Sequence, residues 1–318
     1  MLFRKNHRFK DMKKLRVLIL GGGPSSEHEI SLKTAKMVHK HLDRKKYQPM
    51  LASISRKGRW ELPISKIKSV ADVVFIAMHG EFGEDGTVQK ILDDIKLPYT
   101  GSGFRASALG MDKIRSRQIF KSAGMAVPKF IDSFPVVVKP SDRGSSVGVS
   151  IVKKREDLNA AIKNAKKYSK NVMVEEFVHG AELTCGVLDD GKNNLTPLLP
   201  TEIVPKMGEF FDYASKYTES GSEEITPARV PPEILKECQD IALRAHIAVG
   251  CSGFSRTDMI WSKLDGLPRG KTGKIYVLEI NTIPGLTRQS LLPKAAAASG
   301  ISFPKLLDHI IKSALRKN

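Results

Sequence analysis

Oxygen-bearing side chains recur at strand spacing in the last third of the 318-residue chain. Arg256 and Asp258 lie in one apolar segment, and Glu279 and Asn281 lie in another. Side chains alternate along a strand, so the two members of each couple share a face. If the strands pair, two carboxylates and an amide oxygen converge, and they repel unless a cation lies between them. Such hard oxygen ligands favour magnesium, with phosphate oxygens completing an octahedron.

The plain alternative for these two strands is a solvated polar pair in which Arg256 bridges to Asp258. The apolar neighbours Phe254, Ile260 and Leu278 indicate burial instead, which favours a site. Beside bound cations, Arg256 could stabilise charge that develops on a transferred phosphoryl group or on an oxyanion.

The segment that runs from Lys139 through Arg143, Ser145 and Ser146 has residue types that bind phosphate. Two glycines flank the two serines, which leaves backbone amides and hydroxyls free to wrap phosphate oxygens, and Lys139 adds positive charge. The segment differs from a Walker P-loop, which needs a helix after its lysine. An ordinary β-hairpin loop is the alternative.

Three further turns carry polar residues after predicted strands, at 21–29, 79–86 and 282–291. The first two are rich in glycine, which lets the backbone turn tightly and approach a ligand. Glu27 in the first turn could hold a substrate ammonium, and amides of the third could bind a carboxylate or an oxyanion. Each of them alone would be only a turn or a surface loop.

Short apolar runs and amphipathic segments alternate near the N-terminus. We expect strands at 15–20, 48–53 and 73–77 and helices at 29–42 and 87–94. This βαβ rhythm predicts a parallel sheet with ligand loops at the carboxyl ends of its strands. A new helix should begin near Ser107 and carry Met111 and Lys113.

The remaining elements divide into a small block and a larger one. The small block should hold strands at 129–131, 136–139, 148–152 and 172–177 and a helix at 156–167; the larger one should hold helices at 234–249 and 303–315 and strands at 253–261 and 274–280. The sequence therefore predicts an α/β protein with a Rossmann-like domain at 1–101, a central domain at 102–178 and a C-terminal domain at 179–318. Residues 1–13 read as a basic tail.

Composition excludes several classes of protein. The net charge of +18 comes from basic residues spread along the chain with few aromatics between them, which argues against nucleic-acid binding. Steep salt-dependent binding to DNA or RNA would reverse that interpretation. No apolar run is long enough to cross a membrane. Three cysteines without metal or disulfide spacing fit a reducing cytoplasm.

Taken together, these segments resemble the D-alanine:D-alanine ligase family of the ATP-grasp superfamily, from about Lys14 to about Leu315. Residues 79–86 are similar to its first signature, and Arg256 through Gly285 is similar to its second. Further family-like segments lie at 99–103, 111–113, 139–140 and 211–217. The resemblance implies an ATP-grasp fold, in which two α+β domains grip ATP beside a Rossmann-like domain.

On the nucleotide side, the resemblance assigns groups of residues to parts of ATP. Phosphate contacts would come from Lys113, Lys139 and Ser146. The adenine and ribose pocket would be lined by Glu175, Phe177, Val178 and Glu182. Two magnesium or manganese ions would be held by Asp258, Glu279 and Asn281.

On the amino-acid side, the resemblance assigns the first D-alanine to Glu27, which would bind its ammonium, and to His79 beside it. Glu27 would also form a hydrogen-bonded triad with Ser145 and Tyr217 that closes a mobile loop over the site. The tetrahedral oxyanion would be stabilised by Arg256 and the backbone amide of Gly285. The second D-alanine would be received by Lys216, Ser290 and the Leu291 amide.

The implied reaction joins two D-alanine molecules into D-alanyl-D-alanine for peptidoglycan, through an acyl phosphate made from ATP. The resemblance also implies a homodimer. Two alternatives remain: a ligase that takes D-lactate or D-serine as second substrate, and a catalytically silent ATP-grasp protein. The Lys-Tyr ending of segment 211–217 favours D-alanine, because depsipeptide-forming relatives usually lack it.

The chain departs from the family pattern at three places. Only residues 128–134 stand where the family carries a helix before the strand that ends in Lys139, which could expose apolar surface or alter a dimer contact. The loop at 262–273 is longer than usual and basic, and Thr257 replaces an apolar residue. None of these changes removes a catalytic group.

Overall fold

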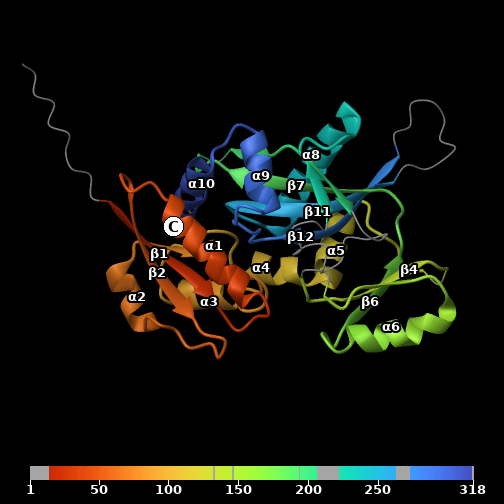
Figure 1. The fold of residues 1–318 in the computed structure, drawn as a ribbon, viewed down its shortest axis with the longest axis horizontal. Helices are drawn as coiled ribbons and strands as arrows, with labels where there is room; N and C mark the ends of the chain where they lie inside the picture. The colour runs from red at the N-terminus through yellow and green to blue at the C-terminus, as the bar shows by residue number, and fades with distance from the viewer. Residues whose placement is uncertain are drawn as a thin grey trace, which may run out of the picture.

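The computed structural model describes residues 14–131, 133–144, 147–192, 194–205, 222–262 and 273–316. Figure 1 shows three sheets: a parallel sheet near the N-terminus, a small antiparallel sheet at the opposite end, and a larger antiparallel sheet that connects them. Several sequence predictions lie outside the described residues: the tail at 1–13, Ser145, Ser146, Lys216, Tyr217 and most of the loop at 262–273.

The first sheet has the strand order β2-β1-β3, with all strands parallel. Its strands are β1 Leu15–Gly22, β2 Tyr47–Ile54 and β3 Val73–Ile76, and its helices are α1 His28–His41, α2 Ile64–Val70 and α3 Thr87–Asp94. The apolar runs of β1 and β3 are buried on both faces, as a parallel sheet covered by helices requires. The predicted Rossmann-like sheet is confirmed.

Two helices follow, α4 Phe104–Met111 and α5 Lys113–Ser122. The prediction of one helix that carries both Met111 and Lys113 is wrong, because Asp112 lies between the helices in an extended conformation. Its carboxylate accepts hydrogen bonds from the amides of Ile114 and Arg115, at 3.0 and 3.1 Å. Asp112 therefore caps the second helix, which begins at Lys113.

The small sheet has the order β5-β4-β6 and is antiparallel. It consists of β4 Val136–Pro140, β5 Ser150–Val152 and β6 Val172–Glu176, and α6 Leu158–Ala165 covers it through a compact core. The strand predicted at 129–131 is wrong, since Lys129 only exchanges single hydrogen bonds with Glu176. Within the described residues no helix lies between α5 and β4, and Phe130 is 59% exposed there.

The larger sheet has the order β10-β9-β7-β11-β12, and β8 pairs with β7. Its strands are β7 Ala181–Asp189, β8 Leu195–Pro197, β9 Thr201–Pro205, β10 Ser222–Ile225, β11 Phe254–Ser262 and β12 Lys274–Asn281. The helices beside it are α8 Pro232–Val249, α9 Leu291–Ala298 and α10 Phe303–Arg316.

Two large cores hold these parts together. One joins β1 and β3 to α9 and α10, so that helices from the end of the chain pack on the first sheet's unit (Figure 1). The other joins α4, α5 and α8 to β7, β11 and β12. Helices α4 and α5 therefore pack with the larger sheet, although the sequence grouped them with the central domain. The division at 101 and 178 stays a prediction.

Candidate active site

The strands β11 and β12 pair antiparallel, as the sequence predicted. Asp258 lies opposite Glu279, and Arg256 lies opposite Asn281. A register shift follows Asp258, so the regular pairing ends where the polar couples end. The predicted convergence of two carboxylates, an amide and a guanidinium on one strand pair is therefore confirmed.

These charges are paired and removed from solvent. Arg256 donates two hydrogen bonds to the Asp258 carboxylate, from Nε at 2.9 Å and from a terminal nitrogen at 2.8 Å. Asp258 is only 8% exposed and also accepts a 2.6 Å bond from the Thr184 hydroxyl. Burial lowers the pKa of Arg256, but the carboxylates of Asp258 and Glu279 outweigh it and leave the pKa raised. The bridge exists, yet the pair is not a solvated one.

The donor set fits magnesium in part. Asp258 and Glu279 supply carboxylates, and Asn281 supplies an amide oxygen that accepts a 2.8 Å hydrogen bond from the Ile283 amide. In the described residues no group of three His, Cys, Asp or Glu side chains is arranged to hold a metal. Any cation here would therefore complete its coordination with oxygens of a substrate, as magnesium does with phosphates.

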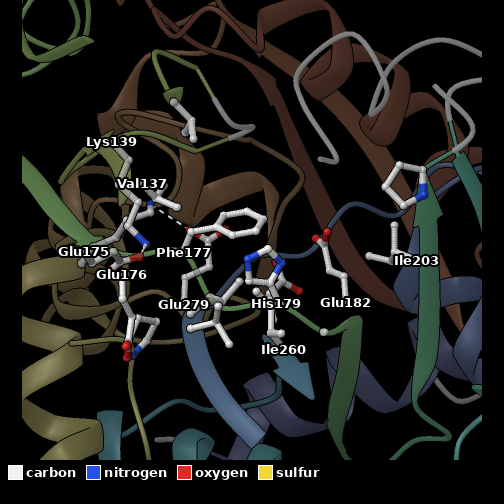
Figure 2. A pocket seen from close by; sticks show the side chains of 18 of the residues that line it. Val137, Lys139, Glu175, Glu176, Phe177, His179, Glu182, Ile203, Ile260 and Glu279 are labelled. Atoms are coloured by element: carbon white, nitrogen blue, oxygen red, sulfur yellow. Dashed lines mark ion pairs between the residues drawn. The ribbon is translucent and has the colours of Figure 1, made fainter. Parts of the chain in front are cut away.

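A cavity of about 400 Å³ lies between the small sheet and the larger one. Figure 2 shows Phe177 and His179 projecting into it, with Lys139 and Glu175 on one side and Glu182 and Ile203 on the other. The residues that the sequence assigned to a nucleotide line this cavity: Lys113, Lys139, Glu175, Phe177, Val178, Glu182, Asp258 and Glu279. Apolar and aromatic walls with a few polar groups suit a nucleobase.

Glu175 is the most deeply buried acid of this cavity, at 3% exposure. It pairs with Lys139 at 2.5 Å and with Arg117 at 2.9 Å. Burial lowers the pKa of Arg117, and the carboxylates of Glu175 and Glu176 oppose that shift. Arg117 also stacks on the exposed ring of Phe130, with its guanidinium carbon 3.9 Å from the ring centre. The sequence did not single out Arg117, because α5 carries no motif at that position.

A second cavity, of about 670 Å³, opens beside the first. Both cavities are lined by Glu182, Ile203, Asp258 and Glu279. The second one is also lined by most residues assigned to the amino-acid substrates: Glu27, His79, Arg256, Asn281, Gly285, Ser290 and Leu291. The carboxylates of β11 and β12 thus form the boundary between the two cavities.

Glu27 lies between two glycines of different loops. A Cβ atom on Gly80 would lie 2.9 Å from the Glu27 carboxylate, and one on Gly144 would lie 3.9 Å from it. Gly80 has a φ of +73°, a conformation that side chains rarely adopt. The backbone amide of Glu27 donates a 3.0 Å bond to the Ser25 hydroxyl, which itself donates to the His79 carbonyl. These contacts explain the glycine-rich turns that the sequence showed.

His79 is buried and bonded on both ring nitrogens. Nε2 lies 2.9 Å from the Thr34 hydroxyl, and Nδ1 lies 3.3 Å from the Glu84 carboxylate. Burial lowers the pKa of His79, but Glu84 and Glu27 raise it further than burial lowers it. Burial raises the pKa of Glu84. Glu84 belongs to the predicted loop at 79–86, but its pairing with His79 could not be deduced from spacing alone.

The turn after β12 ends at a helix N-terminus. Ser290 precedes the first residue of α9, Leu291, and its hydroxyl accepts a 3.0 Å bond from the Thr287 amide. A Cβ atom on Gly285 would lie 2.7 Å from this hydroxyl, so only glycine fits without a shift. Free amides at a helix N-terminus attract carboxylates. The arrangement matches the carboxylate-binding turn expected from the sequence.

Family models match both halves of the chain. A model described as D-ala D-ala ligase C-terminus covers residues 113–312. One described as D-ala D-ala ligase N-terminus covers residues 16–70 and 63–102. Among relatives, a D-alanine–D-alanine ligase of Syntrophobacter fumaroxidans is 42% identical, covering 95% of this chain and 98% of that protein. One of Geotalea uraniireducens is 40% identical, covering 96% and 98%.

Solved structures agree over similar lengths. The VanG D-Ala:D-Ser ligase from Enterococcus faecalis has a TM-score of 0.82 at 32% identity, covering 94% of this chain and 99% of that one. The D-alanine–D-alanine ligase from Bacillus anthracis complexed with ATP has a TM-score of 0.75 at 30% identity, covering 95% and 98%. The chain therefore belongs to the D-alanine–D-alanine ligase family and has its ATP-grasp fold.

Proposed function

We propose that this chain joins two D-alanine molecules into D-alanyl-D-alanine for peptidoglycan, at the expense of ATP. The observation that carries the proposal is the shared wall of the two cavities. A nucleotide in the first cavity and an amino acid in the second would meet at Asp258 and Glu279, beside Arg256. Relatives that are about 40% identical over nearly their whole length carry this activity in their names.

The first step is activation of a carboxylate, which resists attack by an amine until one of its oxygens becomes a good leaving group. The first D-alanine would bind in the second cavity with its ammonium at Glu27 and His79 beside it. One oxygen of its carboxylate would attack the γ-phosphorus of ATP, which releases ADP and forms the acyl phosphate. Lys113 and Lys139 are placed to spread negative charge on the phosphoryl group.

Magnesium is part of the proposal. Asp258, Glu279 and Asn281 would hold one or two ions together with phosphate oxygens, and manganese could replace them. Bound there, the ions would neutralise charge on the transferred group. The carboxylates now face Arg256 and Lys113, so those cations already hold charge-balanced positions near the expected phosphates.

The second step forms the peptide bond. The carboxylate of the second D-alanine would sit at the N-terminus of α9, against Ser290 and the Leu291 amide. Its amine would attack the acyl carbon, and the tetrahedral oxyanion would be stabilised by Arg256 and the Gly285 amide. Collapse then breaks the carbon–oxygen bond to phosphate and leaves the dipeptide.

Four residues outside the described part of the chain complete the proposal. Ser146 would contact phosphate, and Lys216 would contact the second substrate. Ser145 and Tyr217 would join Glu27 in the triad that closes a loop over the site. Exclusion of water by that closure would protect the acyl phosphate.

A D-alanine:D-serine ligase is the second candidate. It is favoured by the TM-score of 0.82 with the D-Ala:D-Ser ligase from E. faecalis, although the D-alanine–D-alanine ligase from Coxiella burnetii reaches 0.81 at 29% identity. The difference is too small to outweigh the names of the relatives with 40% identity. D-Lactate as second substrate, or a silent ATP-grasp protein, would be further from the intact residue set.

We also propose that the protein works in the cytoplasm, where ATP is made, and that it forms a homodimer, as the family resemblance suggests. Within the described part of the chain, no helix is long and apolar enough to cross a bilayer. The short connection at 128–134 leaves Phe130 exposed, which would alter a dimer contact made by that side.

The test is phosphate release from ATP and magnesium with D-alanine alone, and then with excess D-serine or D-lactate, with products identified by mass. We expect D-alanyl-D-alanine as the main product in every mixture and no release after a chelator removes the metal. D-Alanyl-D-serine as the main product would support the second candidate. ATP left intact in all mixtures would contradict both.

A further inference from the structure

Arg143 links three parts of the molecule from a single turn. Its guanidinium forms an ion pair with Glu81, in the loop at 79–86 of the first unit. Its Nε donates a 2.7 Å hydrogen bond to the Tyr168 carbonyl, beyond α6. Its own carbonyl accepts a 2.6 Å bond from the Lys113 ammonium at the start of α5. The turn that contains Arg143 is therefore held from three sides.

This turn forms a wall of the substrate cavity. Gly144, the next residue, lines both that cavity and a neighbouring one of about 560 Å³. A Cβ atom on Gly144 would lie 3.9 Å from the Glu27 carboxylate, so the backbone stands close to the group proposed to bind the first ammonium. The neighbouring cavity is partly open between the loops that carry Glu81 and Arg143. A shift of the turn would join the two cavities.

The opposite side of the turn is tied to the proposed metal site. The backbone amide of Lys113 donates a 2.8 Å bond to the Ser141 carbonyl, and its ammonium pairs with Glu279 at 2.9 Å. The residues on that side belong to the machinery already described. The Glu81 carboxylate is the contact that fixes the turn to the first unit, and it has no role in the proposed chemistry.

We propose that Arg143 is a positioning residue which, through its ion pair with Glu81, holds the turn as a barrier between the substrate cavity and the solvent-facing cavity beside it. The inference rests on the proposed function. Water that passed the barrier would attack the acyl carbon, break its bond to the phosphate oxygen and release D-alanine and phosphate without dipeptide. The pair thus couples phosphate release to peptide formation.

The strength of the pair sets the size of the effect. The Arg143 and Glu81 side chains are 33% and 46% exposed, so water and salt screen their attraction. Reversal of one charge replaces attraction with repulsion at the same place. We expect either single reversal to raise the KM for D-alanine about threefold to fivefold, the scale of a partly exposed ion pair.

The experiment compares Arg143→Glu, Glu81→Arg and the double variant that exchanges the charges. Phosphate and dipeptide are measured in the same reaction. Each single variant should release more phosphate than dipeptide, and the double variant should return the ratio towards that of the unchanged protein. Arg143→Lys keeps the charge but loses the Nε bond to Tyr168, so its ratio should lie between the two.

The matched control exchanges the charges of Lys90 and Asp94, an exposed ion pair within α3. That exchange should leave both the ratio and the KM unchanged, and thermal unfolding with and without ATP checks that each variant folds and binds nucleotide. Single reversals with equal phosphate and dipeptide, or a double variant that stays uncoupled, would overturn the inference. Failure of the proposed function would instead appear in the unchanged protein as absence of dipeptide.

Discussion

At the scale of residues, the site keeps its buried charges in pairs. Arg256 faces Asp258, and Lys113 faces Glu279, each within 3 Å. A buried charge that loses its partner typically costs about 3 to 5 kcal/mol, so these cations are not free to leave. They can only exchange partners, which suits a site where a highly charged nucleotide and its metal enter and depart.

His79 and Glu84 make the site's stability depend on pH. Both pKa values are raised in the folded protein, from ordinary values of 6.5 and 4.5. The folded state therefore binds more protons than the unfolded state, so this pair's contribution to the free energy of unfolding falls as pH rises. It is fully present below the unfolded pKa values and is lost as the pH passes the raised, folded ones.

The comparison that isolates this contribution uses the double variant His79→Gln with Glu84→Gln, which removes both titrating groups. The free energy of unfolding of the natural chain minus that of the variant should decline from acid to alkaline pH in urea titrations. A difference that stays flat, or that grows with pH, would contradict the assigned pKa directions.

Sequence alone identified the charged residues that stand in motifs, and it missed their partners. Arg256, Asp258 and Glu279 were found because strand periodicity placed them on common faces. Arg117 and Thr184 were not found, because the first comes from a motif-free helix and the second from the neighbouring strand β7. Contacts between segments far apart in the chain leave no local pattern.

At the scale of elements, the start of α5 decides where Lys113 points. Asp112 ends α4 and caps α5 through the amides of Ile114 and Arg115. The break turns the chain, so that Lys113 begins the new helix and reaches Glu279. One continuous helix would have carried Lys113 past this position.

Replacement of Asp112 by Ala should therefore lower the free energy of unfolding by about 1 kcal/mol, the usual value of an N-cap. Asp112→Ser retains an oxygen that can accept the same bonds and should be close to neutral. Urea unfolding of both variants gives the comparison. Equal losses for Ala and Ser would mean that the side chain does not act as a cap.

Elements with strong periodicity were predicted well and irregular ones were not. The parallel strands and the long helix α8 have continuous apolar patterns, so their positions followed from the sequence. The strands β8, β9 and β10 are short and half-buried, and they form only because β7 pairs with β8 and β9 and because β9 pairs with β10. Segment 129–131 has strand-like residues but gains only isolated bonds to Glu176.

At the scale of the whole molecule, function follows from the meeting of two cavities. The nucleotide cavity lies between two sheets, and the substrate cavity reaches from the first sheet's loops to α9. Their common boundary is the strand pair β11–β12. Sequence placed the residues in separate domains, but no pattern in it could give the packing of α4 and α5 against β12, which brings Lys113 to that boundary.

The most direct test of the account follows an oxygen atom. D-Alanine labelled with heavy oxygen in its carboxylate would be supplied with ATP and magnesium, and the phosphate released would be weighed by mass spectrometry. Formation of an acyl phosphate predicts that each phosphate released with a dipeptide carries one oxygen from D-alanine. Unlabelled phosphate accompanying the dipeptide would contradict activation of the carboxylate by ATP at this site.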